Sequence, residues 1–131
     1  MVYFVGAGPG AADLITVRGM RLLEKADVVI YAGSLVNPEL LSYCKKECEI
    51  HNSAYMTLEE VLAVMEEAEK QKLTTVRLHT GEPSIYGAVR EQMDLLDEKG
   101  ILYEFIHEID KVLEEIDSPK LKLNDKKTIF A

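Results

Sequence analysis

The sequence is short of cysteine, of cationic side chains and of long apolar runs, and each shortage excludes a class of protein. Its only two cysteines, Cys44 and Cys48, have His51 alone as a further nearby ligand, which is too few for a metal site. We therefore expect two reduced thiols. No apolar run approaches the ~20 residues that a membrane helix needs. The N-terminal residues lack the basic stretch and cleavage site of a signal peptide, so the expected location is the cytoplasm, without a membrane partner.

Acidic side chains outnumber basic ones by 23 to 15, which gives the 131-residue chain a formal net charge of −8. A nucleic-acid partner is disfavoured, because phosphate binding requires clustered cations. The charge also provides no long-range attraction for an anionic ligand, so local arginines would have to hold one. Apolar residues make up 47% of the chain, which is ordinary for a globular domain.

Apolar runs and helical periodicities alternate along the first 106 residues. The pattern predicts strands at residues 2–5, 27–31, 49–51, 74–79 and 101–106, and helices at residues 14–25, 37–46, 57–72 and 88–98. Asp13 or Thr16 is expected to cap the first helix, Asn37 the second, and Thr57 with Glu60 the third as a capping box. This alternation predicts an α/β fold, a three-layer domain with a mostly parallel five-stranded sheet.

Two glycine-bearing loops follow the first and fourth expected strands, GAGPG at residues 6–10 and TGEPSIYG at residues 80–87. Ligands of parallel sheets bind beyond the carboxyl ends of the strands. Both loops are therefore expected at one edge of the sheet, where together they form the candidate site.

The first loop by itself leaves alternatives open. Gly6, Gly8 and Ala11 fit the dinucleotide fingerprint. However, the second strand ends at Tyr31 without the acidic residue that holds a ribose, and Pro9 removes an amide that a phosphate would use. A nucleotide phosphate loop is excluded, because no Gly-Lys-Ser/Thr follows. The glycines also fit a plain tight turn between strand and helix.

Three segments taken together resemble one family. They are VGAGPG with the Asp-Leu-Ile-Thr that follows it, YAGSLV at residues 31–36, and HTGEPSIYG at residues 79–87. In this combination the chain resembles the tetrapyrrole methylases, which use S-adenosylmethionine. Residues 26–41 and 79–93 are similar to the members that methylate precorrin-4 at carbon 11 in cobalamin biosynthesis. The resemblance extends to about residue 106.

The resemblance implies a function and a set of site residues. Members of the family are two-domain α/β enzymes, usually homodimers, that bind S-adenosylmethionine between the domains and a tetrapyrrole, here a corrin precursor, beside it. Because the cofactor's methyl group is already electrophilic, the protein has only to hold the cofactor and orient the substrate beside it. No catalytic residue or metal ligand is therefore expected. The expected cofactor residues are Pro9, Thr80, Gly81, Glu82 and Ile85, and the expected substrate residues are Gly8, Gly10, Arg18 and Arg77.

The sequence departs from the family in three places. Ala11 stands where the family usually has aspartate, and Glu82 replaces the aspartate of a Gly-Asp-Pro loop. After Ile106 the family continues with a second domain, whereas residues 107–131 diverge and begin with an amphipathic helical pattern. We expect a family N-terminal domain at residues 1–106 and a helical tail that replaces the second domain.

Two functions follow as expectations. The first is an S-adenosylmethionine-dependent precorrin-4 methyltransferase in a truncated form, whose activity the truncation puts in question. The alternative is a non-catalytic binding or interaction module derived from the same domain.

Overall fold

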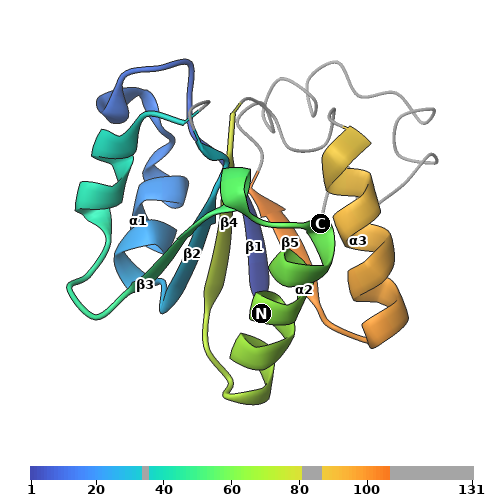
Figure 1. Ribbon diagram of the computed structural model, residues 1–131. Helices are drawn as coiled ribbons and strands as arrows, with labels where there is room; N and C mark the ends of the chain where they lie inside the picture. Colours follow the sequence, from blue (N-terminus) through green and yellow to red (C-terminus); the bar gives the residue numbers. More distant parts are fainter. Residues whose placement is uncertain (34–35, 81–86, 107–131) are drawn as a thin grey trace, which may run out of the picture.

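Parallel strands form one five-stranded sheet in the computed structural model of the chain, which describes residues 1–33, 36–80 and 87–106 (Figure 1). The strands are β1 Val2–Gly6, β2 Val28–Tyr31, β3 Glu49–Asn52, β4 Thr75–His79 and β5 Tyr103–Ile106. Their order is β3-β2-β4-β1-β5, and every neighbouring pair is parallel. The sheet confirms the predicted α/β class, and the carboxyl ends of its strands meet at the upper edge in Figure 1.

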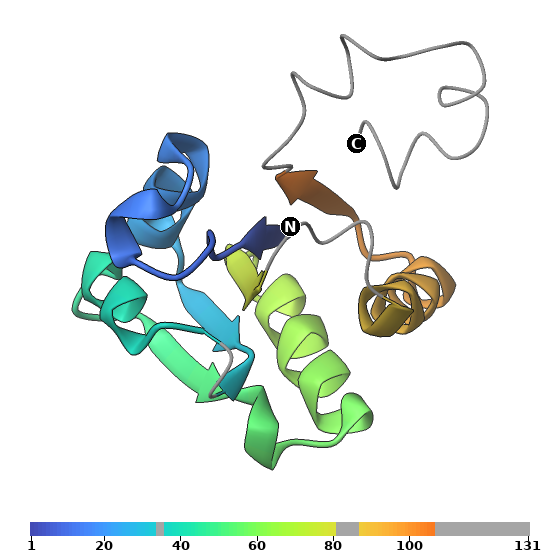
Figure 2. The ribbon, with the colours of Figure 1, turned by 90° about the horizontal axis from the view of Figure 1, so that it is seen from above.

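Helices cover both faces of this sheet. They are η1 Ala12–Leu14, α1 Val17–Lys25, η3 Pro38–Tyr43, η4 Ser53–Tyr55, α2 Leu58–Lys70 and α3 Gly87–Lys99, where η denotes a 3-10 helix. Figures 1 and 2 show α1 and η3 on one face and α2 and α3 on the other, which confirms the predicted three layers. Among the helices within the described ranges, none has the length and apolarity of a membrane span.

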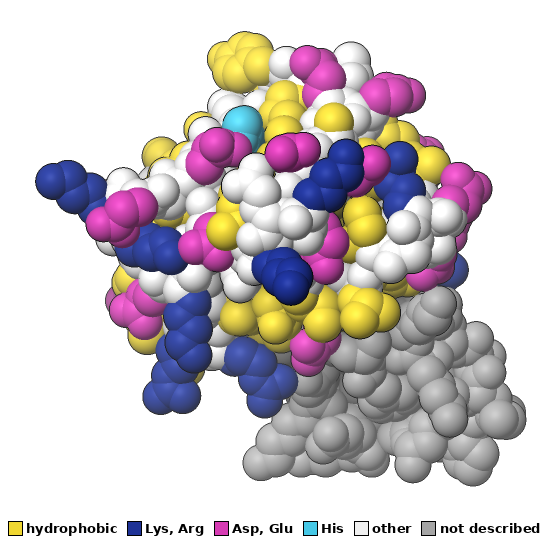
Figure 3. Space-filling model, turned by 90° about the horizontal axis from the view of Figure 1, so that it is seen from below, with side chains coloured by type: hydrophobic (Ala, Val, Ile, Leu, Met, Phe, Trp, Pro, Cys, Tyr) yellow, Lys and Arg dark blue, Asp and Glu magenta, His cyan; other side chains and the backbone are white. Residues whose placement is uncertain are grey.

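The amino ends of the strands form the lower edge of the sheet. Just before β2, the Asp27 carboxylate accepts from the Thr74 amide at 2.8 Å and pairs with the Lys45 ammonium at 2.7 Å. The hydrogen bond from Lys45, helped by the Thr74 amide, holds the pKa of Asp27 below its usual range. Figure 3 views the molecule from this side and shows acidic and basic side chains interspersed over the surface.

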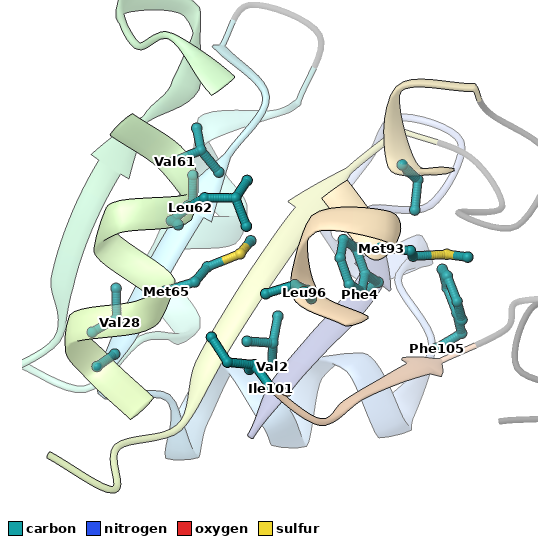
Figure 4. Packing of buried hydrophobic residues seen from close by; sticks show 13 residues of the cluster. Val2, Phe4, Val28, Val61, Leu62, Met65, Met93, Leu96, Ile101 and Phe105 are labelled. Atoms are coloured by element: carbon teal, nitrogen blue, oxygen red, sulfur yellow. The ribbon is translucent and has the colours of Figure 1, made fainter. Parts of the chain in front are cut away.

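Alternate side chains of β1, β2 and β5 enter two separate apolar cores, one on each face of the sheet. In β1, Val2 and Phe4 lie in the core beneath α2 and α3, whereas Val5 lies in the core beneath α1 and η3. Figure 4 shows the first core, where Met65 of α2 and Leu96 of α3 lie over the sheet beside the side chains of β1. All five side chains are fully buried, so both faces of the sheet are covered, as a parallel sheet requires.

Helix caps set the start of α1 and α2. The first helix begins at Val17, three residues later than predicted, because Thr16 has extended backbone angles and its hydroxyl accepts from the Gly19 amide at 3.0 Å. The predicted capping box of α2 is confirmed. The Thr57 hydroxyl accepts from the Glu60 amide at 3.1 Å, and the Glu60 carboxylate accepts from the Thr57 amide at 2.9 Å.

The segment predicted as an α-helix over residues 37–46 forms the shorter 3-10 helix η3 instead. Asn37 caps it as predicted, because its Oδ1 accepts from the Glu39 amide at 3.0 Å. The Ser42 hydroxyl donates to the Glu39 carbonyl oxygen at 2.7 Å. That oxygen is the acceptor that an α-helical bond from Tyr43 would use, so a local side chain competes with the α-helical pattern.

Candidate functional site

The two glycine-bearing loops begin side by side at the carboxyl edge of the sheet. β1 and β4 are neighbours, and their register pairs Gly6 with His79. One residue further, the Ala7 amide donates to the His79 carbonyl oxygen at 2.6 Å. The first loop and Thr80, which opens the second loop, therefore leave the sheet at adjacent points, as predicted. We call this edge the rim and define it by residues 6–12 and 79–80.

The first loop turns outward at Gly8. Its φ angle of +83° lies in the region that favours glycine, and a Cβ there would stand 2.8 Å from the Leu14 carbonyl oxygen. Gly8 is buried, whereas Pro9 and Gly10 are exposed. Apart from Gly10 itself and its two chain neighbours, no described atom lies within 4 Å of the point that a Cβ on Gly10 would occupy. The tip of the loop therefore presents main chain to open space.

Two side chains from η3 and its cap hold the first loop. Asn37 Nδ2 donates to the Gly10 carbonyl oxygen at 3.0 Å, and the Tyr43 hydroxyl donates to the Ala12 carbonyl oxygen at 3.1 Å. The sequence predicted a capping role for Asn37 and no role for Tyr43. Nothing in the linear pattern indicates these contacts, because the partners are 27 and 31 residues apart.

The predicted cofactor residues fall into two groups. Pro9 and Thr80 lie at the rim, where Pro9 is exposed and Thr80 is half-buried. Gly81, Glu82 and Ile85 lie outside the described residues, and their roles stay predictions. The two glycines predicted to face the substrate flank Pro9 in the same loop.

Arg77, a predicted substrate residue, is enclosed by protein groups on the α2 and α3 side of the sheet. It is only 7% exposed, and its Nε donates to Gln92 Oε1 at 3.1 Å. Its Nη1 donates to the Ile30 carbonyl oxygen at 3.2 Å, and its Nη2 donates to Ser53 Oγ at 3.1 Å. Burial lowers the pKa of Arg77 to about 10, which leaves the guanidinium charged at neutral pH. The hydrogen bonds of this side chain therefore connect β4 to β2, η4 and α3.

Arg18, the other predicted substrate arginine, lies in the first turn of α1 on the opposite face and is exposed. The structure therefore does not bring the two arginines together. Of the pair, only Arg18 has its side chain at the surface of the described molecule.

Cys44 and Cys48 are free thiols, in agreement with the sequence prediction. Burial raises the pKa of Cys44, and it raises the pKa of Cys48 to about 12. Both thiols are therefore protonated at neutral pH.

The described part of the rim consists largely of main chain. It offers exposed backbone at Gly10, the ring of Pro9 and the hydroxyl of Thr80, and Asn37 and Tyr43 support it from one side. Within the described ranges, no three histidine, cysteine or acidic side chains gather as metal ligands would. Such a rim is suited to holding and orienting a ligand beside the first loop.

Comparisons with known proteins agree with the resemblance seen in the sequence. The profile of the Tetrapyrrole (Corrin/Porphyrin) Methylases matches residues 1–112. The cobalt-precorrin-4 C(11)-methyltransferase of Methanocaldococcus jannaschii is 52% identical over 122 residues, which cover 93% of this chain and 47% of that protein. Because this match is longer than residues 1–106, the similarity extends into residues 107–131. The expected division into a domain and a tail stays a prediction.

Solved structures share the fold. The X-ray structure of a cobalt-precorrin-4 methyltransferase superposes with a TM-score of 0.77 at 45% identity, covering 81% of this chain and 44% of that one. The uroporphyrin-III C-methyltransferase of Thermus thermophilus, complexed with S-adenosylhomocysteine, gives a TM-score of 0.67 at 29% identity, covering 87% of this chain and 47% of that one. The chain thus spans less than half the length of these relatives. The matching profile and the level of identity show that the chain belongs to the tetrapyrrole methylases.

Proposed function

We propose that this chain forms the S-adenosylmethionine-binding part of a C-methyltransferase that acts on precorrin-4 at carbon 11 in cobalamin biosynthesis. The hydrogen bond between Ala7 and His79 carries the proposal, because it sets the starts of the two loops side by side at the rim. The relatives named as precorrin-4 methyltransferases support the reaction, and the relative complexed with S-adenosylhomocysteine supports the donor.

The groups at the rim fit such a donor. Gly10 leaves open space beside exposed main chain, and Pro9 adds a rigid ring at the turn. When bound, S-adenosylmethionine supplies an electrophilic methyl group, so the residues of this chain have to hold the donor in line with the accepting carbon. The residues that we assign to the donor are Pro9, Thr80, Gly81, Glu82 and Ile85.

The substrate side of the proposed site is formed by Gly8, Gly10 and Arg18. The macrocycle carries several carboxylates, which an exposed guanidinium binds well. Arg18 has that exposure. Arg77 already donates to four protein groups, so we propose that it supports the rim by holding β2 and α3 in place.

Methyl transfer is proposed for an assembly larger than this chain, because the chain spans less than half the length of its relatives. The other side of the donor site would come from the part of the relatives that this chain does not match, and the family resemblance implies a homodimer. The cytoplasmic location and the absence of nucleic-acid and membrane partners stay predictions from the sequence.

Calorimetric titration of the 131-residue chain with S-adenosylhomocysteine tests the donor site. We expect saturable heat with this ligand and none with NAD at the same concentration. Thr80→Ala should weaken binding by about threefold to tenfold through the loss of one hydrogen bond. Leu102→Ala, at an exposed position at the lower edge, should not weaken it. No heat at millimolar protein and ligand would reject the donor site and favour the non-catalytic interaction module.

A further inference from the structure

We infer that Asn37 and Tyr43 are positioning residues of the donor site, which hold the backbone of the first loop in the shape that receives the donor. The inference rests on the proposed function, because it assigns these side chains a part in donor affinity. Neither residue touches the donor in this scheme. Both act through main-chain carbonyl groups of the rim.

The orientation of the Asn37 side chain follows from its two contacts. Its Oδ1 accepts from the Glu39 amide at 3.0 Å, so its Nδ2 is the atom that faces the Gly10 carbonyl oxygen, also at 3.0 Å. One side chain therefore caps η3 and tethers the exposed tip of the first loop at the same time.

The hydrogen bond from Asn37 to Gly10 connects segments that follow two different strands of the sheet. Asn37 follows β2, and Gly10 follows β1, whereas β4 lies between these two strands in the sheet. The hydrogen bond between them therefore links the segments that follow two strands lying on either side of β4. It ties the exposed tip of the first loop to the residue that caps η3.

Tyr43 supplies the second point of attachment from the far end of η3. Its hydroxyl reaches the Ala12 carbonyl oxygen at 3.1 Å, two residues beyond Gly10. The loop is thus fixed on both sides of Ala11. A loop held in its bound shape loses less conformational freedom when a ligand binds, so these two bonds should raise donor affinity without contacting the donor.

Asn37→Asp provides the sharpest test. Aspartate keeps an oxygen for the Glu39 amide but replaces the donor NH2 by an oxygen that repels the Gly10 carbonyl. We expect the Kd for S-adenosylhomocysteine, measured by calorimetry, to rise about tenfold, and about threefold in Tyr43→Phe. Asn37→Ser keeps an uncharged cap and should also weaken binding, which separates the lost tether from the added charge.

Two matched controls remove similar groups elsewhere. Asn52→Asp makes the same change in a residue that also caps a 3-10 helix, where its Oδ1 accepts from the Ala54 amide at 2.9 Å. Tyr103→Phe removes a hydroxyl that donates to Asp97 at 3.3 Å. Both controls should bind S-adenosylhomocysteine as tightly as the parent chain. Unchanged melting temperatures in the Asn37 and Tyr43 variants would separate positioning from general stability.

A readout without ligand tests the tether itself. The Leu14 amide donates to the Ala11 carbonyl oxygen at 3.0 Å within the tethered segment, so its hydrogen exchange, followed by NMR, reports loop order. We expect faster exchange in Asn37→Asp and Tyr43→Phe and no change in the controls. Unchanged exchange in both variants would overturn the inference.

The two readouts separate the possible failures. If the parent chain binds S-adenosylhomocysteine and both variants bind it equally well, the positioning role is wrong and the proposed function stands. If the parent chain gives no heat, the proposed function is wrong and the donor role of Asn37 and Tyr43 is rejected with it.

Discussion

Gly19 of α1 lies so close to Val5 of β1 that a Cβ on Gly19 would stand 2.9 Å from Val5 Cγ1. The Thr16 hydroxyl, which caps the helix, would be 3.0 Å from the same point. This approach lets α1 pack directly on the strand that leads into the rim. Replacement of Gly19 is therefore expected to disturb both the helix cap and the sheet contact.

We predict that Gly19→Ala lowers the free energy of unfolding by up to about 2 kcal/mol. The clash with a stiff, fully buried valine and with the cap costs about 1–3 kcal/mol, which outweighs the roughly 1 kcal/mol that alanine gains over glycine in a helix. Urea denaturation measures the effect. Glu24→Ala, at an exposed position of the same helix, is the control and should change stability by less than about 0.5 kcal/mol.

Gly8→Ala should affect stability and donor binding together. The positive φ angle costs about 1–2 kcal/mol in any non-glycine residue, and the Cβ would also meet the Leu14 carbonyl oxygen at 2.8 Å. Gly100 has a φ angle of +70° with no described atom within 4 Å of its Cβ position. Gly100→Ala therefore measures the φ penalty alone. Equal losses in the two variants, in urea denaturation, would show that the contact with Leu14 is unimportant.

Arg77→Lys should be strongly destabilising, although the charge is kept. A lysine has no planar fork and cannot serve Gln92, Ile30 and Ser53 at once. Partners left without hydrogen bonds in a buried position lower the free energy of unfolding by about 2–4 kcal/mol. Arg21→Lys, at an exposed position of α1, is the control and should leave the free energy of unfolding unchanged within error. A thermally stable Arg77→Lys chain would contradict the supporting role given to this side chain.

The ion pair of Asp27 and Lys45 predicts a pH dependence at the acidic end. Because the folded-state pKa of Asp27 is lowered, its contribution is fully present above the unfolded value of about 3.9. It is lost as the pH falls through the lower folded value. The free energy of unfolding of the parent chain should exceed that of Asp27→Asn by about 1 kcal/mol at pH 7, and the difference should vanish below the folded pKa.

Lys45→Met tests the assigned cause of that lowered pKa. Without the ammonium, the pKa of Asp27 should rise toward its usual range, so the loss of stability on acidification should be smaller and should be complete at a higher pH than in the parent chain. Thermal unfolding between pH 2 and pH 7 measures both variants. Superimposable profiles for the parent chain and Lys45→Met would show that Lys45 does not set the pKa.

The resemblance to the family assigned site residues in the second loop, where the structure describes only Thr80 and Gly87. Gly81, Glu82 and Ile85 were assigned by matching motif positions, and they lie outside the described residues. The opposite case is Arg77, whose motif neighbourhood suggested a substrate contact. Arg77 is buried because β4 lies between β2 and β1 in the sheet. The residues around Arg77 in the sequence do not indicate this strand order.

The sequence by itself determined the strands and the capping box at Thr57, because each depends on residues within a few positions of one another. It also indicated the family, because the three motifs can be matched position by position without the fold. Only the tertiary structure decided that Asn37 donates to Gly10 and that Arg77 connects β4 to β2, η4 and α3. These contacts span up to 47 residues and depend on strand order. Periodicity and capping act along a helix or strand, whereas strand order is settled by the packing of all the elements together.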